Sequence, residues 1–371
     1  MPRYAESITA LLRAILWDEP LSVDPSVLLE PELWYALHRQ QLTHMVAVWA
    51  LNHGLPVAQP AEQKLRIFTT LQRRQRQNRL LTDLVTLLRR HDIEPVLLKG
   101  YSLALLYSNP DMREYGDVDF YIGERNYERM IPVVREAYPD AFWFSEEHAG
   151  LHFSMVLDEN LDRVAEFHRV AMELHHMPRA DKAFQQFTLD EMHRTRTVEL
   201  NGVTVSLPSR TYDALYVFMH AWHHFLPCGV GLRQLADWAL ALREAASEKD
   251  LTATLEPLLN AMHMREVWQT FGWVIVNQLG LPREQFPLYT DACAAKGEQL
   301  FRQLLKDGHC GREQRFRLFG ATLYFYPYIR PEQGRLRQKL YTLGRLTFQA
   351  LQTAKLFPKY AFHDYFGTLF H

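Results

Sequence analysis

The sequence predicts an α+β protein in which a small mixed β-sheet is surrounded by N-terminal and C-terminal helices. Three observations predict this class. Apolar residues recur at helical spacing before residue 90 and again after residue 209. Between these stretches, short apolar or alternating runs of strand length are separated by turn residues. Hydrophobic residues make up 47% of the 371 residues and charged residues 23%, so the chain can bury a sizeable core.

Residues 1–90 are predicted to form an N-terminal helical region. Residues 5–17 form an amphipathic helix, and residues 32–53 continue the helical pattern as far as Gly54. Residues 60–90 form a long helix that carries many Arg and Gln side chains opposite its apolar face.

Residues 91–208 are predicted to form an α/β core. A buried strand is followed by a turn at Lys99-Gly100 and a short helix, and a second strand precedes another helix. Asn201-Gly202 is a strong signal for a two-residue hairpin turn. The predicted strands are 95–98, 117–122, 141–144, 152–157, 163–170 and a hairpin over 198–207, and the predicted helices are 101–107 and 124–138.

Residues 209–371 are predicted to form a C-terminal helical domain. The strongest helical periodicities fall at 211–226, 231–246, 251–279, 296–305 and 335–356.

Composition narrows the class of protein. The chain has 41 basic and 43 acidic residues, so no general attraction to nucleic acid or membrane follows from its net charge of −2. Cys228, Cys293 and Cys310 form no CxxC pair and predict no disulfide framework. Charges interrupt the apolar residues at the N-terminus, and no stretch has the ~18 uninterrupted apolar residues of a membrane span. We expect a cytoplasmic protein.

Asp117-Val118-Asp119 is the most informative motif. Two acidic residues separated by one residue on a strand point to the same face. Carboxylates placed side by side repel each other unless a cation lies between them. The motif therefore predicts a divalent metal, and a bound Mg²⁺ suggests phosphate chemistry.

A third carboxylate would complete a two-metal site. Glu166 lies on the second strand of the predicted hairpin, and His168 follows on the same strand face. Glu173 is a rival because it too stands two residues before a histidine. The hairpin register favours Glu166, since Glu173 lies past the strand.

Several separated motifs resemble one family. Leu97-Leu98-Lys99-Gly100, then Arg113-x-x-Gly116-Asp117-Val118-Asp119, resembles the nucleotidyltransferase superfamily of DNA polymerase beta type. The Lys-Gly turn is closest to the bacterial branch of uncharacterised nucleotidyltransferases. Ala165-Glu166-Phe167-His168-Arg169 and the segments His220 to Phe225 and Gly231 to Trp238 are similar to its later elements. The resemblance covers about residues 30–280.

The resemblance implies transfer of NMP from an NTP, with ATP the expected donor, to an acceptor hydroxyl with release of pyrophosphate. Asp117, Asp119 and Glu166 would be the catalytic residues and would hold Mg²⁺ or Mn²⁺. Lys99, Gly100, Arg113 and His168 would contact the nucleotide. The acceptor is not identified, and a small molecule, a tRNA end and a protein side chain are all candidates.

Alternatives stand beside this hypothesis. Members of the superfamily usually have a Gly-Ser turn whose backbone N–H groups approach the triphosphate. Lys99 replaces the first of these small residues, so its ammonium either meets a phosphate directly or obstructs that backbone contact. Arg113 is equally suited to a structural ion pair. A catalytically inactive nucleotide-binding or scaffold protein is therefore the alternative. A histidine-based metal hydrolase is the weakest hypothesis, because the histidines at 220, 223 and 224 lack a complete ligand motif and a helix face packed on the core is favoured for them.

Overall fold

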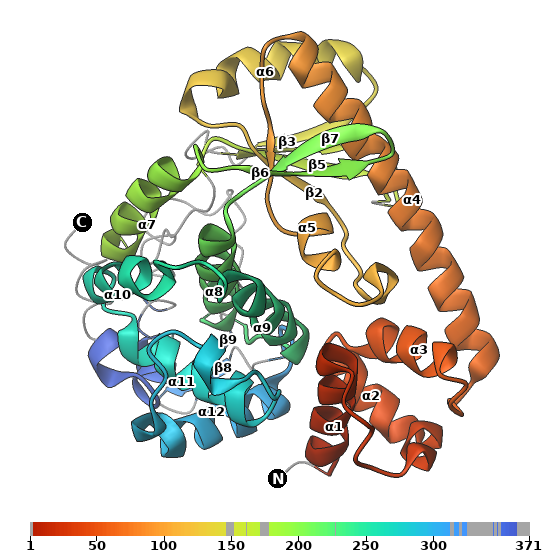
Figure 1. The fold of residues 1–371 in the computed structure, drawn as a ribbon, viewed down its shortest axis with the longest axis vertical. Helices are drawn as coiled ribbons and strands as arrows, with labels where there is room; N and C mark the ends of the chain where they lie inside the picture. The colour runs from red at the N-terminus through yellow and green to blue at the C-terminus, as the bar shows by residue number, and fades with distance from the viewer. Residues whose placement is uncertain are drawn as a thin grey trace.

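A seven-stranded mixed β-sheet flanked by helices confirms the predicted α+β class (Figure 1). The computed structural model describes residues 3–145, 152–160, 162–170, 178–226, 228–311, 315–318, 321–324, 344, 347 and 350–361. The strand order in the sheet is β3-β4-β5-β2-β1-β7-β6. The strands are β1 Val96–Leu97, β2 Val118–Tyr121, β3 Phe142–Ser145, β4 His152–Val156, β5 Val164–His168, β6 Arg196–Leu200 and β7 Val203–Leu207.

Strand β2 lies at the centre of the sheet. It pairs with β5 in parallel and with β1 in antiparallel fashion, and β1 in turn pairs with β7 in parallel. The predicted hairpin of β4 and β5 is confirmed. So is the hairpin of β6 and β7, where Asn201 and Gly202 have φ values of 50° and 77°, as a two-residue turn with two left-handed positions requires.

Twelve helices are described around this sheet. They are α1 Ala5–Trp17, α2 Pro31–Arg39, α3 Thr43–Asn52, α4 Pro60–Arg90, α5 Tyr101–Ala104, α6 Glu124–Ala137, α7 Pro178–Glu191, α8 Arg210–Phe225, α9 Leu232–Ala245, α10 Leu251–Ala261, α11 Arg265–Asn277 and α12 Ala294–Asp307. No described helix is both long and apolar enough to cross a membrane.

Two of the predicted helices are each divided in the structure. The helix predicted over 32–53 breaks between α2 and α3 because Gln41 is left-handed (φ 58°) and the N–H of Leu42 returns to the carbonyl of Leu37. The helix predicted over 251–279 breaks in the same way, at His263 (φ 56°). Both are helix-ending geometries that apolar periodicity does not reveal.

Other differences are smaller. The helix predicted over 101–107 ends at Ala104. Helix α7 and the two-stranded sheet of β8 (Arg315–Leu318) and β9 (Ala321–Tyr324) were not predicted. Most of the helix predicted over 335–356 lies outside the described residues.

Two hydrophobic cores divide the molecule. One lies on the sheet and includes apolar side chains from the last turns of α4 and from α6. The other joins the N-terminal helices α1 to α3 with the C-terminal helices α8 to α12. Figure 1 shows the sheet and α6 at one end of the molecule and these helices at the other, with α4 running between the two ends.

Gln40 links three helices inside the second core. Its side chain is 1% exposed; Nε2 donates to the carbonyls of Leu304 (3.1 Å) and Leu305 (3.3 Å) in α12. Its Oε1 accepts from the N–H of Leu232, the first residue of α9 (3.0 Å). One amide thus satisfies backbone groups at the end of one helix and the start of another.

We expect Gln40→Leu to lower the free energy of unfolding by about 2–4 kcal/mol, because it leaves buried backbone groups without partners. Urea unfolding followed by circular dichroism measures this change. A loss below about 0.5 kcal/mol, the level of an ordinary surface substitution, would contradict the structural role of Gln40.

Candidate functional site

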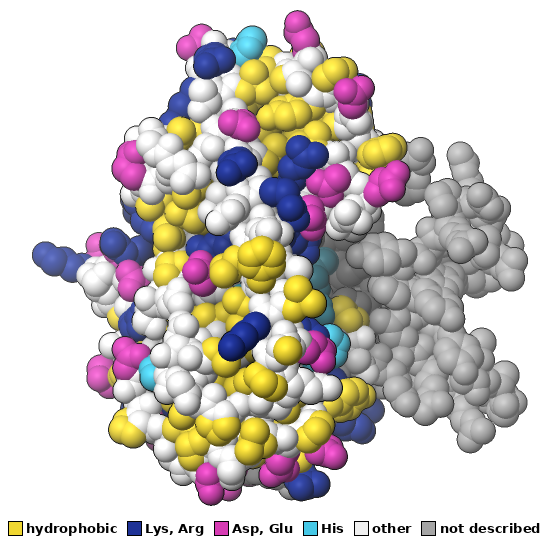
Figure 2. Space-filling view, turned by 90° about the vertical axis from the view of Figure 1, so that its right-hand side faces the viewer, with side chains coloured by type: hydrophobic (Ala, Val, Ile, Leu, Met, Phe, Trp, Pro, Cys, Tyr) yellow, Lys and Arg dark blue, Asp and Glu magenta, His cyan; other side chains and the backbone are white. Residues whose placement is uncertain are grey.

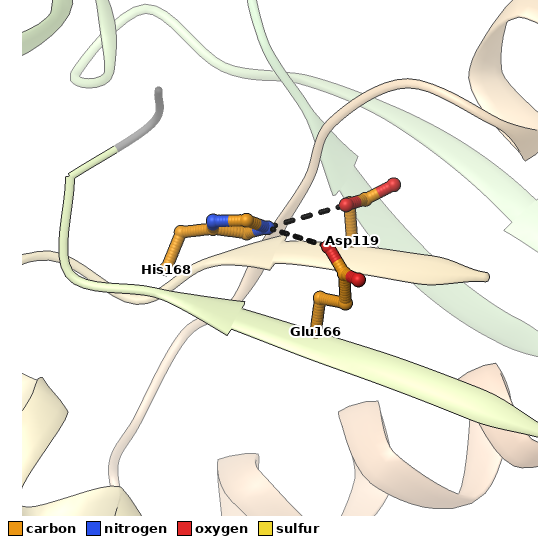
Figure 3. A group of neighbouring side chains, drawn as sticks. All are labelled: Asp119, Glu166 and His168. Carbon is orange, nitrogen blue, oxygen red and sulfur yellow. Dashed lines mark hydrogen bonds and ion pairs between the residues drawn. The ribbon is translucent and has the colours of Figure 1, made fainter. Parts of the chain in front are cut away.

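Two parallel strands bring the predicted acidic residues together. In the pairing of β2 with β5, Asp119 lies opposite Glu166, and His168 follows two residues later on the same face. Ligand atoms of Asp119, Glu166 and His168 all lie within 4.8 Å of one another. Figure 3 shows the three side chains converging from the two strands. Glu173, the rival third carboxylate, lies outside the described residues.

Asp119 is fully buried between two cationic side chains. Its Oδ2 accepts from the ammonium of Lys99 at 2.8 Å, and its Oδ1 lies 3.2 Å from Nε2 of His168. The same imidazole nitrogen lies 3.6 Å from Oε2 of Glu166. Lys99 therefore contacts the carboxylate of Asp119 directly. The sequence analysis expected Lys99 to contact the nucleotide and did not predict this ion pair.

The charges in this cluster shift one another's pKa. Burial disfavours the imidazolium of His168, but hydrogen bonds to Asp119 and Glu166 outweigh it and raise the pKa of His168 to about 9. Burial also opposes the charge of Lys99, yet Asp119 and Asp117 raise its pKa well above the ordinary value. The pKa of Glu166 is lowered because His168 and Lys99 overcome its burial.

Asp117 lies just before β2 and lines the same cleft as Glu166. The negative charge of Asp119, followed by burial, raises the pKa of Asp117, so the two carboxylates do sense each other. Among the described residues, however, Asp117 does not join the set whose ligand atoms lie within 4.8 Å of one another.

Gly100 shapes the turn that carries Lys99. Its φ of 86° lies in the left-handed region, which side chains other than glycine rarely adopt. A Cβ at this position would lie 3.6 Å from the carbonyl oxygen of Asp117, so the turn passes close to the acidic segment.

Arg113 forms a buried ion pair with a residue of the C-terminal helices. Its Nε and Nη2 donate to the two carboxylate oxygens of Asp237 at 2.9 and 3.0 Å, and its Nη1 donates to the carbonyl of Gly100 at 3.0 Å. Tyr107 and Arg233 also donate to Asp237. Arg113 therefore forms a structural ion pair, as the alternative interpretation of the sequence proposed. Its partner is Asp237 and not Asp117 or Glu114, the partners that the sequence suggested.

These residues border a cleft of about 800 Å³, a volume within the range of small-molecule sites. Its walls come from the N-terminal helices, the turn and loop before β2, strand β5, and helices α8 and α9. Figure 2 shows Lys and Arg side chains gathered at mid-height on one side of the molecule. Basic residues of the lining are Arg66, Arg73, Lys99, Arg113 and Arg233.

The histidines of α8 line this cleft. His220, His223 and His224 are half-buried and face it, which corrects the prediction that this helix face packs on the core. In the described part of the chain they form no group of three possible metal ligands within 4.8 Å. Burial lowers the pKa of His220 well below its ordinary value and that of His224 to about 4, so both imidazoles are neutral at pH 7.

Sequence reasoning missed several side chains of the lining, and Tyr216, Gln234 and His309 are three of them. Tyr216 stands one turn before His220 on α8, and the charge of Lys99 acts on it. Gln234 and His309 come from α9 and from the segment after α12, and their side chains contact each other at 3.1 Å. For Tyr216 the local signal was its spacing, four residues before His220 and eight before His224 on α8.

The donor set fits a hard divalent cation. Three carboxylates, at 117, 119 and 166, face two cations, Lys99 and His168, and so leave one formal negative charge. Carboxylate oxygens are the ligands preferred by Mg²⁺. Asp119 and Glu166 are already close enough to share one ion, and His168 would have to release its proton to bind one.

We expect the imidazole of His168 to titrate with a pKa of about 9 in the metal-free protein. A folded-state pKa above the unfolded value near 6.5 stabilises the fold below about pH 6.5, and this contribution is lost as the pH rises through 9. NMR titration of the histidine signals tests it, with His168→Gln for assignment and Asp119→Asn to lower the value. A pKa at or below 6.5 would contradict the observed pairing.

Comparisons with known proteins identify the family of this chain. The family described as "Uncharacterised nucleotidyltransferase" matches residues 29–276, well over half of the chain. An antigenic nucleotidyltransferase-like protein from Paracoccidioides brasiliensis is a structural match with a TM-score of 0.35 and 14% identity, over 59% of this chain and 96% of that one. A TM-score of 0.35 is too low for this match to support a conclusion about fold or function. No curated protein matches the chain. On the family match, the chain belongs to the uncharacterised nucleotidyltransferase family.

Proposed function

We propose that this protein transfers a nucleoside monophosphate from an NTP, with ATP the expected donor, to an acceptor hydroxyl and releases pyrophosphate. The observation that supports it best is the meeting of Asp119 and Glu166 across two parallel strands at the edge of a large cleft. Family membership supports the same reaction class. We also propose that this chain belongs to the nucleotidyltransferase superfamily of DNA polymerase beta type and to a bacterial branch of it.

In this proposal, Asp117, Asp119 and Glu166 hold Mg²⁺ or Mn²⁺. When bound, such an ion would polarise the phosphates of the NTP and stabilise the pyrophosphate as it leaves. The protein's own residues do the rest. Glu166 is ionised and either adds a ligand or accepts the proton of the acceptor hydroxyl. Lys99 and His168 contact the two carboxylate oxygens of Asp119 and fix the side chain in place.

Arg113 would position the nucleotide indirectly, through the turn that carries Lys99 and Gly100. Arg113 holds the carbonyl of Gly100 while its other nitrogens hold Asp237. The Lys99-Gly100 turn is thereby anchored to α9. We therefore assign Arg113 a positioning role and leave Lys99 and Gly100 as the groups nearest an incoming phosphate.

A second candidate is a nucleotide-binding protein without turnover. Both carboxylate oxygens of Asp119 are engaged by cations, Lys99 on one and His168 on the other. A protein that keeps this arrangement would bind nucleotide without the metal. The experiment below separates the two candidates.

The test measures pyrophosphate release from each of the four NTPs with Mg²⁺ or Mn²⁺, using a small-molecule and macromolecular extract as the acceptor source. We expect release with one NTP that stops when metal is chelated and in Asp119→Asn and Glu166→Gln. Asp190→Asn, an exposed aspartate of α7, is the matched control. Nucleotide binding that needs no metal, with no pyrophosphate from any NTP, would favour the second candidate.

A further inference from the structure

Two of the three cysteines meet in the structure although they are 82 residues apart in the sequence. Cys228 follows helix α8 and Cys310 follows helix α12, and their Sγ atoms lie 2.8 Å apart. Both are present as thiols. A disulfide bond is about 2.05 Å long, so the two sulfurs lie within about 1 Å of bonding distance. Cys293 stands before the first residue of the 14-residue helix α12, about 20 Å from the end that carries Cys310.

The backbone already holds the two thiols in place. The N–H of Cys310 donates to the carbonyl of Gly229, the residue after Cys228, at 3.2 Å. The N–H of Cys228 donates to the carbonyl of His224 in the last turn of α8 at 3.3 Å. Cys310 has a φ of 50°, in the left-handed region that residues with a side chain rarely adopt, and such a conformation persists where the surrounding contacts fix it. A bond between the sulfurs therefore requires little movement of the backbone.

The two thiols differ in their access to solvent. Cys228 is 7% exposed, and its Sγ also lies 3.5 Å from the carbonyl oxygen of His224. Cys310 is exposed, and Nε2 of His309 lies 3.7 Å from its Sγ. A dissolved oxidant therefore reaches Cys310 first, while Cys228 stands behind it where it can displace a group bound to Cys310. An exposed cysteine beside a second, resolving cysteine is the arrangement of reversible redox sites.

A metal site is the other chemistry that two thiols and an imidazole suggest. In the described part of the chain, however, Cys228, Cys310 and His309 do not form a group of three possible ligands within 4.8 Å. Zinc is typically held by three or four protein ligands. The pair is therefore suited to redox chemistry and not to a metal.

We propose that Cys228 and Cys310 form a reversible redox pair, in which a small-molecule disulfide such as glutathione disulfide oxidises the two thiols to one intramolecular disulfide. The Cys310 thiol loses its proton and attacks one sulfur of glutathione disulfide, whose S–S bond breaks and releases one glutathione. The Cys228 thiol then loses its proton, attacks the sulfur of Cys310 and releases the second glutathione, and each departing glutathione sulfur takes up one proton. The two protein thiols lose two electrons, which reduce the glutathione disulfide.

This bond would join two segments of the cleft wall. His309 precedes Cys310 and lines the cleft, as does His224, and their ring centroids lie 6.0 Å apart. A disulfide at this point closes a loop across 82 residues, and a link over so long a loop stabilises mainly by restricting the unfolded chain. Because Cys310 is exposed, reducing agents can reach the link and reverse it. The inference does not depend on the proposed function.

The test follows the thiols of the whole chain before and after incubation with glutathione disulfide at mildly alkaline pH. We expect the number of titratable thiols to fall from three to one, with the mass lower by two hydrogen atoms and no glutathione attached. The melting temperature should rise by about 5 °C, and dithiothreitol should reverse both changes. Peptide mapping without reduction should show Cys228 joined to Cys310.

Three variants separate the roles of the cysteines. Cys310→Ala should lose no thiol, because the remaining two are buried, whereas Cys228→Ala should stop with a single glutathione attached to Cys310. Cys293→Ala is the matched control and should still form the disulfide, so that no thiol remains. A stable glutathione adduct on the wild type, a covalent dimer through Cys310, or unreacted thiols at both 228 and 310 would overturn the proposal. Cys310→Ala changes an exposed side chain, so its result does not depend on whether Cys228→Ala folds.

Discussion

Asp119→Asn is expected to lower pyrophosphate release by about 10³-fold, equivalent to about 4 kcal/mol of transition-state stabilisation. Among the carboxylates that the structure describes, Asp119 alone contacts both Lys99 and His168, and its ligand atom lies within 4.8 Å of those of Glu166 and His168. Its amide analogue keeps the shape but loses the charge that a metal would need. Initial rates at saturating NTP and metal, with wild type alongside, give the ratio.

The variant's fold must be checked separately, because Asp119 is buried and its loss leaves Lys99 without a counter-charge. Thermal unfolding shows whether the assay temperature lies below the transition. Lys99→Met/Asp119→Asn removes both charges and should recover stability without recovering activity. A rate within tenfold of wild type in a folded Asp119→Asn protein is incompatible with the proposed role.

Asp237→Asn is expected to lower the free energy of unfolding by about 3–5 kcal/mol. Asp237 is 3% exposed and accepts from Arg113, Tyr107 and Arg233, so the amide leaves two guanidinium groups without a counter-charge. Equilibrium urea unfolding measures the loss.

A double-mutant cycle isolates the ion pair. Combined with Arg113→Met, Asp237→Asn should cost less than the sum of the single changes, with a coupling of about 2–4 kcal/mol. The exposed pair Arg302–Glu298 on α12 is the control and should give at most about 0.5 kcal/mol. A coupling that small for Arg113 and Asp237 means that the bridge between the turn and α9 contributes nothing.

The part of the site that local spacing determines was predictable from the sequence. Alternation placed Asp119 on a strand, and the hairpin argument placed Glu166 on a strand paired with 152–157, which the register of β4 and β5 confirms. That β5 also pairs with β2 follows from the sheet order. Both steps depend on side chains two residues apart sharing a strand face.

Contacts between distant segments were not predictable. Arg113 and Asp237 are 124 residues apart, and no local pattern marks them as partners. The histidines of α8 have the same spacing whether the helix faces a core or a cleft, so their exposure depends on the tertiary arrangement. Helix ends at Gln41 and His263 depend on backbone angles that hydrophobic periodicity does not encode.

In the proposed reaction, the acidic cluster at Asp119 and Glu166 transfers a nucleotidyl group. The most direct measurement compares NTP labelled at the α-phosphorus with NTP labelled at the γ-phosphorus, incubated with Mg²⁺ or Mn²⁺ and the acceptor extract. We expect the α-label to become attached to an acceptor while the γ-label leaves as pyrophosphate, and neither to occur in Asp119→Asn. Transfer of the γ-label to an acceptor, or α-label transfer that persists in that variant, would contradict it.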